Sequence, residues 1–297
     1  MFIFNPAAGK GRGVRHLRAI REAVTAAGFT PDFRHTQEPG HGAALAEAAA
    51  RDGVDTVVAI GGDGTVGEVV AGLMRVDAAR RPALGLIPVG TGNDYAKVLK
   101  LKPGDFRAAA LTLAARITRP LDVGEVNGRF FANGFGLGFD GTVAENAAAI
   151  RFVEGFPAYL VSVFKTLSSW KNFELSVESD EGAWNGRALL ACVSIGSCCG
   201  GGFYLTPDAL PDDGLFDLCT LGDFGKLEAI ANLPKALKGA HVGHPKVAIR
   251  RSRRIVLRSD RPLTAHLDGN LILRVGHSEP LVFRIHEGAL RVIGKWE

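Results

Sequence analysis

The chain has 297 residues, of which 46% are hydrophobic and 22% charged, and its formal net charge is +4 at pH 7. Its length and composition suit a soluble globular protein with one large or two medium domains. The weak, dispersed positive charge gives no argument for nucleic-acid binding, although it is compatible with approach to an anionic membrane surface. No apolar stretch reaches the roughly 20 residues of a spanning helix, and a strand begins at the N-terminus, so we expect neither membrane anchor nor signal peptide.

The four cysteines indicate a reducing environment. They show no C-x-x-C spacing, so neither a zinc site nor a disulfide framework is indicated. We expect reduced, buried thiols in a cytoplasmic protein. The residues concerned are Cys192, Cys198, Cys199 and Cys219.

The first 119 residues alternate short apolar runs with helical patterns. Strands are predicted at residues 1–4, 31–35, 56–60 and 83–87. Helices are predicted between them, the first ending at Gly28 and the second, residues 42–52, ending at Gly53. Alternating strands and helices predict a parallel, helix-covered sheet.

The pattern after Pro120 is richer in strands, which predicts a second domain over residues 120–297. The last strand, residues 289–297, either belongs to this domain or returns to the first. Helical segments are predicted within residues 143–165 and 226–237, which contain Pro157 and Pro234 as breaking or kinking residues. Strands are predicted at residues 121–126, 129–135, 174–177, 187–195 and 215–221, with several more between 247 and 292.

Two glycine-framed acidic loops follow predicted strands, at residues 61–65 (GGDGT) and 88–94 (PVGTGND). Glycines let backbone N–H groups approach an anion, and the helix that begins after each loop adds partial positive charge. Asp63 and Asp94 indicate a hydrated Mg²⁺. Because strand ends of one parallel sheet share a crevice, both loops are expected to converge there on a polyphosphate.

Each loop also has a purely structural interpretation. Thr65 and Glu68 fit a capping box that would start a helix at residues 66–74. In the second loop, Asn93 or Asp94 alternatively caps a helix that begins near residue 95.

The N-terminal loop, residues 5–13, matches neither the dinucleotide fingerprint nor the P-loop pattern. It is either a flexible strand-to-helix turn or a place where Asn5 and the loop backbone meet a nucleotide.

Taken together, these loops and three later segments resemble the bacterial diacylglycerol-kinase-like lipid kinases, which are relatives of the sphingosine kinases. The later segments are residues 200–202 (GGG), 207–209 (PDA) and 212–217 (DDGLFD). The GGDGT segment alone is shared with NAD kinases, but the later segments favour the lipid branch. The resemblance implies a nucleotide-binding α/β domain, a β-sandwich second domain and ATP bound in the cleft between them.

The resemblance also assigns site residues. It implies that Asp63, Asp94 and Asp122 hold waters around the catalytic Mg²⁺, and that Asp213 with the carbonyl of Leu215 binds a structural Mg²⁺. An Asp-Gly hairpin turn is the alternative for Asp213 and its neighbour Asp212. Nucleotide contacts fall on Asn5, Thr36, Gly62, Thr65 and Thr91, with Gly61, Gly64, Gly90 and Asn93 from the same two loops.

Asp268 is the candidate general base. It lies in the segment HLDGN between two apolar runs, where turn chemistry also explains the Asp-Gly pair. The resembling family carries Asp-Gly-Glu here, and its Asp is regarded as the group that takes the proton of the lipid hydroxyl. Asn270 replaces the Glu, and because an amide cannot accept a proton, turnover is expected to be reduced or lost if that Glu supports the base or a metal. By period two, His266 lies on the same strand face as Asp268.

The sequence thus predicts an ATP-dependent kinase that phosphorylates a diacylglycerol-like lipid with Asp63 and Asp268 as catalytic residues and Mg²⁺ as cofactor. It is expected in the cytoplasm or peripherally at the inner membrane face, without nucleic acid, and its oligomeric state stays open. The alternatives are an NAD kinase-like enzyme and a nucleotide-binding regulator that has lost catalysis. Six arginines between residues 250 and 261 form either a solvated strand edge or a docking site for anionic lipid headgroups.

Overall fold

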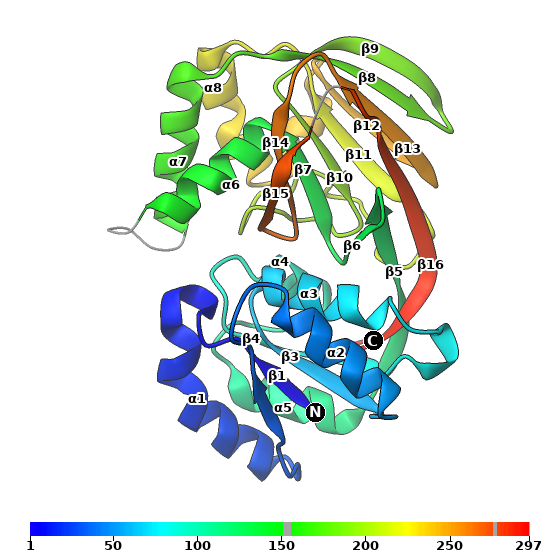
Figure 1. Ribbon diagram of the computed structural model, residues 1–297. Helices are drawn as coiled ribbons and strands as arrows, with labels where there is room; N and C mark the ends of the chain where they lie inside the picture. Colours follow the sequence, from blue (N-terminus) through cyan, green and yellow to red (C-terminus); the bar gives the residue numbers. More distant parts are fainter. Residues whose placement is uncertain (151–155, 276–277, 297) are drawn as a thin grey trace. The chain divides into compact units, whose positions relative to one another are not determined.

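The computed structural model describes residues 1–150, 156–275 and 278–296. The chain divides into two compact units (Figure 1): unit 1 comprises Met1–Val123 and Glu287–Glu297, and unit 2 comprises Gly124–His286. Strands β5 (Thr118–Val126) and β16 (Leu281–Ile293) carry the chain from one unit to the other. Over the described ranges, no helix combines the length and apolarity needed to cross a membrane.

Unit 1 contains the predicted parallel sheet. Its strands lie in the order β2-β1-β3-β4, and the end of β16 runs parallel to β4 through the pair Val292 and Leu84. Strands β3 and β4 are apolar along almost their whole length because helices cover both faces of the sheet. The bounds are β1 (Phe2–Phe4), β2 (Phe33–His35), β3 (Thr56–Gly61) and β4 (Ala83–Pro88).

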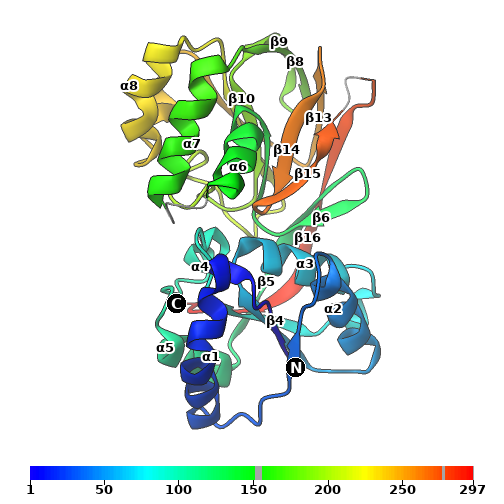
Figure 2. The same ribbon diagram turned by 60° about the vertical axis from the view of Figure 1, so that its left-hand side comes forward.

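Helices α1 and α5 share one hydrophobic core with the sheet, and α2 packs against α3 (Figure 2). Gly28 and Gly53 follow the first two helices with φ angles of 90° and 75°, so the predicted glycine stops are confirmed. The helices are α1 (Ala8–Ala26), α2 (His41–Arg51), α3 (Asp63–Leu73), α4 (Asp94–Val98) and α5 (Phe106–Ala115), with a short 3₁₀ helix, η1 (Ala78–Arg80).

Unit 2 is a β-sandwich, as expected. Its first sheet contains β16, β13 (Arg254–Ser259), β8 (Phe173–Ser179) and β9 (Gly182–Ala188) in that order, and β6 (Arg129–Phe131) pairs with β5. The second sheet has the order β12-β11-β10-β7-β14-β15. Its strands are β7 (Gly134–Gly138), β10 (Leu190–Ser194), β11 (Phe216–Leu221), β12 (Val247–Ser252), β14 (Leu263–Leu267) and β15 (Asn270–Val275).

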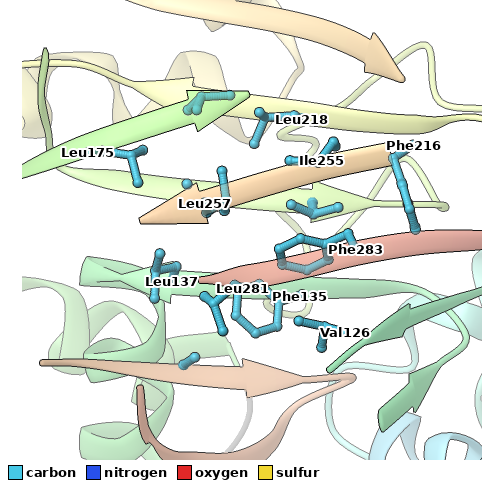
Figure 3. Close-up of a cluster of buried hydrophobic side chains, with 14 of the residues drawn as sticks. Val126, Phe135, Leu137, Leu175, Phe216, Leu218, Ile255, Leu257, Leu281 and Phe283 are labelled. Atoms are coloured by element: carbon cyan, nitrogen blue, oxygen red, sulfur yellow. The ribbon is translucent and has the colours of Figure 1, made fainter. Parts of the chain in front are cut away.

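The two sheets of unit 2 enclose one apolar core, in which Phe135, Phe216 and Phe283 make edge-to-face contacts (Figure 3). Successive residues of strand β10 lie on opposite faces of its sheet. Ala191 and Val193 point into the sandwich core, whereas Leu190 and Cys192 join a second cluster beneath the helices. Those helices are α6 (Phe139–Ala149), α7 (Phe156–Ser169) and α8 (Lys226–Ala236), followed by the 3₁₀ helix η2 (Ala240–Gly243).

All four cysteines are buried thiols, as predicted. The predicted strand 129–135 is wrong as one element, because β6 ends at Phe131 and β7 begins at Gly134. The intervening N–H groups of Ala132 and Asn133 donate to a side chain instead of a neighbouring strand.

The two prolines that were predicted to break or kink helices lie near helix ends. Pro157 lies in the first turn of α7, where a missing N–H removes no helical hydrogen bond. Pro234 lies inside α8, which ends two residues later.

Candidate active site

In unit 1, three loops that follow β1, β3 and β4 are in mutual contact. The side-chain amide of Asn5 donates to the hydroxyl of Thr65 at 3.0 Å, and its oxygen accepts the N–H of Ala7 at 2.9 Å. A Cβ on Gly9 would lie 2.5 Å from the carbonyl oxygen of Val89. The structure therefore brings Asn5 and Thr65 together, two of the residues to which nucleotide contacts were assigned.

The two acidic loops touch through their glycines. A Cβ on Gly90 would lie 2.3 Å from the Cα of Gly62, so this approach is possible only without a side chain at that position. Oδ1 of Asp63 accepts the N–H of Tyr95, in the first turn of α4, at 2.9 Å. This bond holds Asp63 next to Asp94. The two carboxylates that the sequence singled out therefore lie close together in unit 1.

Asn93 shapes the second loop. It has a left-handed φ of 52°, its Oδ1 accepts the Gly90 N–H at 2.9 Å, and its Nδ2 donates to the Gly90 carbonyl at 2.7 Å. Asp94 begins α4, is buried, and forms an ion pair with Lys97 at 2.6 Å. Thr91 is exposed at the loop tip.

The predicted capping box of Thr65 and Glu68 is wrong. Helix α3 begins at Asp63, three residues earlier than predicted, and its N-cap is Gly62, which has no side chain to cap it. The Glu68 carboxylate instead accepts the N–H groups of Gly40 and Gly42, at 2.9 Å and 3.0 Å, at the start of α2. Glu68 therefore caps the neighbouring helix, because packing α2 against α3 places those amides within its reach.

Thr36 and Asp122 also belong to unit 1. Thr36 follows β2, is buried, and donates its N–H to the carbonyl of Phe4 at 2.9 Å. Asp122 lies on β5 and is 2% exposed, and its Oδ1 accepts the N–H of Gly288 at 2.7 Å. The carboxylates of Asp63, Asp94 and Asp122 are hard oxygen donors, which fits Mg²⁺ bound through its waters.

Asp268 is a buried carboxylate in unit 2, at the turn between β14 and β15. The positive φ angles of Asp268 and Gly269, 45° and 77°, are those of a two-residue hairpin turn, so the structural interpretation of this Asp-Gly pair is confirmed. Its carboxylate also accepts the N–H groups of Ala132, Asn133 and Gly134, at 2.7 Å, 2.9 Å and 3.0 Å. Burial raises the pKa of Asp268, and the three N–H donors oppose that shift.

Asn270, the departure from the family pattern, is the first residue of β15. Its side chain lies outside the described part of the structure.

A second polar cluster in unit 2 was missed from the sequence. Asp140, in the first turn of α6, accepts a hydrogen bond from the Tyr159 hydroxyl at 2.8 Å and lies 2.9 Å from Nε2 of His266. Asp140 and His266 are each more than 90% buried. Burial opposes the charged form of His266, but the Asp140 carboxylate outweighs it and raises the pKa of His266, while the imidazole holds the pKa of Asp140 below its usual range. The available signal was that Asp140 lies two residues after the glycine that ends a buried strand, as Asp63 does.

Strand register explains how this cluster assembles. His266 on β14 is paired with Gly136 on β7, and Gly136 is paired with Cys192 on β10. A Cβ on Gly136 would lie 2.1 Å from Oδ2 of Asp140 and 2.4 Å from Nε2 of His266. The ion pair therefore occupies the space that the missing side chain leaves on the sheet.

Beside this cluster, a largely apolar pocket lies between α7, α8 and the outer face of the second sheet. It encloses about 730 Å³ of empty space, including the part open to solvent. Asp140, Tyr159, Asn232 and His241 are its polar lining residues. Its apolar lining includes Val163, Leu167, Phe203, Phe224, Ile230 and Leu233. Such a lining suits a hydrocarbon chain that carries a polar group.

The acidic segment after the GGG loop contains a further oxygen cluster. Asp213 accepts the N–H of Leu215 at 3.0 Å and forms an ion pair with Arg251. Asp217 was not singled out from the sequence, yet it is 2% exposed and its Oδ2 is buried without a hydrogen-bond partner among the described residues. Burial raises the pKa of Asp217 to about 6, Arg251 opposes this, and Asp213, Asp208 and Glu181 add to it. An orphaned carboxylate oxygen among like charges fits a cation site.

The arginines between residues 250 and 261 have partners within unit 2. Arg251 pairs with Asp213, the guanidinium of Arg250 lies 5.8 Å from the Trp184 ring centroid, and that of Arg261 lies at the same distance from Trp170. These three arginines thus contact other side chains of unit 2, and headgroup docking by this basic segment stays a prediction.

Comparison with known proteins covers both units. The model of the diacylglycerol kinase catalytic domain matches residues 1–126, and that of the YegS C-terminal NAD kinase beta sandwich-like domain matches residues 135–294. The chain is 32% identical to a diacylglycerol kinase of Bacillus subtilis over 268 residues, which are 90% of this chain and 88% of that protein. It is 31% identical to a diacylglycerol kinase of Staphylococcus aureus over 271 residues, with coverage of 90% and 84%.

Solved structures share the fold. A crystal structure of a diacylglycerol kinase from Bacillus anthracis superposes with a TM-score of 0.73 and 24% identity, covering 99% of this chain and 96% of that one. Yeast NADH kinase superposes with a TM-score of 0.51 and 12% identity over 99% of this chain and 83% of its own, so it shares the fold alone. From its catalytic-domain match and its identity with curated relatives along most of their length, the chain belongs to the diacylglycerol kinase family.

Proposed function

We propose that this protein is an ATP-dependent lipid kinase that transfers the γ-phosphate to the hydroxyl of a diacylglycerol-like lipid. Unit 1 would hold the nucleotide, and unit 2 would hold the lipid. The observation that carries the lipid assignment is the pocket of unit 2, whose lining is mostly aliphatic and aromatic. NAD carries two phosphates and many hydroxyls, which such a lining would leave without partners.

Nucleotide binding would rest on the three loops of unit 1. The amides at the start of α3, together with the glycines at 61, 62, 64 and 90, would meet the phosphates of ATP, because a helix N-terminus favours anions. Asn5, Thr36, Thr65, Thr91 and Asn93 would complete the contacts.

Metal binding would rest on carboxylates. The waters of the catalytic Mg²⁺ would be held by Asp63, Asp94 and Asp122. When bound, this ion would neutralise phosphate charge. Asp213 and the Leu215 carbonyl would hold a second, structural Mg²⁺, and the orphaned oxygen of Asp217 suits the same ion.

Proton transfer would rest on Asp268. A lipid hydroxyl is a poor nucleophile at neutral pH, so a carboxylate within hydrogen-bond reach must take its proton. Burial raises the pKa of Asp268, which makes it a better proton acceptor than an exposed carboxylate, while the three backbone N–H groups hold its side chain in one orientation and favour the ionised form. We propose that the protein acts in the cytoplasm or at the inner membrane face, where diacylglycerol-like lipids are available.

A transfer assay with radiolabelled ATP and Mg²⁺ tests the proposal. Diacylglycerol, other lipid alcohols and NAD are offered separately, and label is expected in the lipid phosphate only. Label in NADP would replace the proposal with the NAD kinase-like alternative. ATP-dependent thermal stabilisation without label in any acceptor would support the regulator.

Asn270 offers a matched variant for the last outcome. If the family's Glu supports the base, Asn270→Glu raises turnover with lipid. If the parent has no lipid kinase activity, Asn270→Glu restores that activity. If turnover is unchanged, position 270 has no part in proton transfer.

A further inference from the structure

A row of side chains that can bind metals crosses the outer face of the second sheet of unit 2. Cys219 on β11 is paired with Cys192 on β10, and Cys192 with Gly136 on β7. Gly136 is in turn paired with His266 on β14. Directly paired residues of neighbouring strands point to the same side of a sheet, so this row lies on one face. The helices of unit 2 cover that face, because Cys192 and Cys219 belong to the buried cluster beneath them.

Another thiol and a carboxylate meet Cys192 above this row. Cys199 lies in the loop after β10, where it forms a bridge with Phe203. Asp140, in the first turn of α6, lies over Gly136. The Sγ atoms of Cys192 and Cys199 and an oxygen of Asp140 all lie within 4.8 Å of one another. The ligand atoms of a tetrahedral zinc site lie about 3.5–3.8 Å apart, so small side-chain rotations would bring these three atoms onto one ion.

Burial and hydrogen bonding suit these three side chains to a metal. Their exposed fractions are only 1–7%. The hydrogen bonds of Asp140 with Tyr159 and His266 hold its carboxylate in one orientation, and each oxygen keeps a further lone pair for an ion. The hydroxyl of Ser194 lies 3.2 Å from the thiol of Cys192 and can donate to a thiolate there. Metal-binding side chains usually have such outer partners, which orient them.

The types of ligand select the metal. Thiolates are soft ligands that favour Zn²⁺ over Mg²⁺, and a carboxylate is compatible with Zn²⁺ as a third ligand. Three protein ligands leave the fourth position of a tetrahedral ion to water or to a bound molecule. Asp140 and Cys199 also line the apolar pocket of unit 2, so an ion held by them would border that pocket.

We propose that Asp140, Cys192 and Cys199 bind Zn²⁺ at the wall of the pocket. Binding forms two Zn–S bonds and one Zn–O bond, and the two thiols release their protons to solvent. The ion ties α6, β10 and the loop after β10 together. The spacing of the cysteines in the sequence does not indicate this site, because strand register and a loop bring its ligands together. The site does not rest on the proposed lipid kinase function.

Cobalt titration tests the site. The full chain is purified with reduced thiols, stripped of metal with EDTA, and titrated with Co²⁺ as a spectroscopic substitute for Zn²⁺. Excess Mg²⁺ is present to occupy sites built from carboxylates alone. We expect a thiolate-to-cobalt charge-transfer band in the near ultraviolet and strong visible bands of a tetrahedral ion, saturating at about one ion per chain. Added Zn²⁺ should displace Co²⁺ and bleach these bands.

Single cysteine variants identify the ligands. Loss of an outer partner alone lowers metal affinity about 10–100-fold, so Cys199→Ser, which removes a ligand, should bind Co²⁺ at least about 100-fold more weakly. Its charge-transfer band should also be weaker. Cys198→Ser is the matched control, because Cys198 is the adjacent residue, is 3% exposed and does not belong to the group of three. Cys198→Ser and Cys219→Ser should both bind like the parent.

A measurement on the parent decides the matter if Cys199→Ser does not fold, which circular dichroism shows. Zn²⁺ added in weakly buffered solution should release about two protons per ion, because two thiols ionise, whereas carboxylates that are already ionised release none. A reduced parent without charge-transfer band or proton release overturns the proposal. So does a band that folded Cys199→Ser keeps, or one that Cys198→Ser loses equally. A band lost in Cys219→Ser but kept in Cys199→Ser would place the metal between Cys192 and Cys219 and overturn this ligand set.

Discussion

Nε2 of His266 lies 2.9 Å from Oδ2 of Asp140, directly over Gly136, so a buried ion pair fills the space of an absent side chain. The two residues are far apart in sequence, and only the pairing of β14 with β7 brings them together. Asp140 also lines the pocket, where it accepts a hydrogen bond from the Tyr159 hydroxyl.

Replacing Gly136 by Ala should destabilise unit 2. The new methyl group would overlap Oδ2 of Asp140 and Nε2 of His266 and force the buried pair apart, at a cost of about 2–4 kcal/mol in the free energy of unfolding. Urea denaturation measures the loss. Gly134→Ala is the control on the same strand, because its Cβ would have no atom closer than 3.5 Å and its cost should stay below about 1 kcal/mol. Equal losses in both variants would show that β7 merely disfavours side chains.

The same pair predicts a pH window for stability. The pKa of His266 is raised above its ordinary value of 6.5, so its contribution is present below pH 6.5 and is lost as pH rises through the higher folded-state pKa. The pKa of Asp140 is lowered below 3.8, so its contribution is present above pH 3.8 and is lost as pH falls through the lower folded-state value. Stability from this pair should therefore be greatest between these two ordinary values.

Unfolding titrations from acid to alkaline pH check this window. His266→Gln should remove the decline on the alkaline side, whereas His16→Gln, at an exposed position of α1, should leave it in place. A decline that persists in His266→Gln would have to come from another group.

Asp268→Asn should lose both turnover and stability. The Asn side chain has one accepting oxygen only, and its NH₂ group would face backbone N–H groups with which it cannot form a hydrogen bond. We expect this to lower the free energy of unfolding by about 1–3 kcal/mol. Loss of the proton acceptor should lower kcat about 100-fold or more, well beyond what partial unfolding explains. Assays at a temperature where the variant is fully folded separate the two effects, and parent-like kcat there would remove Asp268 as base.

Asp63→Asn should abolish most lipid phosphorylation while keeping the fold. The amide oxygen can still accept the Tyr95 N–H, so the contact between the two loops survives, but the negative charge near the metal is lost. We expect a fall in kcat of about 100-fold or more with an unchanged melting temperature. Asp77→Asn, on an exposed residue of the same unit, should behave like the parent.

Magnesium should stabilise unit 2 through Asp213 and Asp217. A cation beside the orphaned Oδ2 of Asp217 would relieve the repulsion among the neighbouring carboxylates, so added Mg²⁺ should raise the melting temperature. Asp217→Asn should be more stable than the parent without Mg²⁺ and respond less to the ion. Asp223→Asn, an exposed carboxylate paired with Arg187, controls for general salt effects. An identical response in all three proteins would exclude a site here.

The sequence by itself determined the features that depend on neighbouring residues. Apolar runs of the right length gave β1, β3 and β4, and Gly28 and Gly53 ended the first two helices, because strand burial and left-handed φ angles are local properties. The same local logic put the glycine-framed loops with Asp63 and Asp94 at the ends of successive parallel strands.

The tertiary structure alone decided which distant groups satisfy each other. Glu68 looks like a cap for its own helix, yet it caps α2, because the first N–H groups of a helix have no partner within it and bind the carboxylate that packing brings near. The apolar run at 129–135 is split because Asp268, more than 130 positions later in the chain, accepts the N–H groups at its centre. The Asp140–His266 pair and the pocket likewise arise from strand pairing and helix packing, and contacts between residues so far apart leave no periodicity in the sequence.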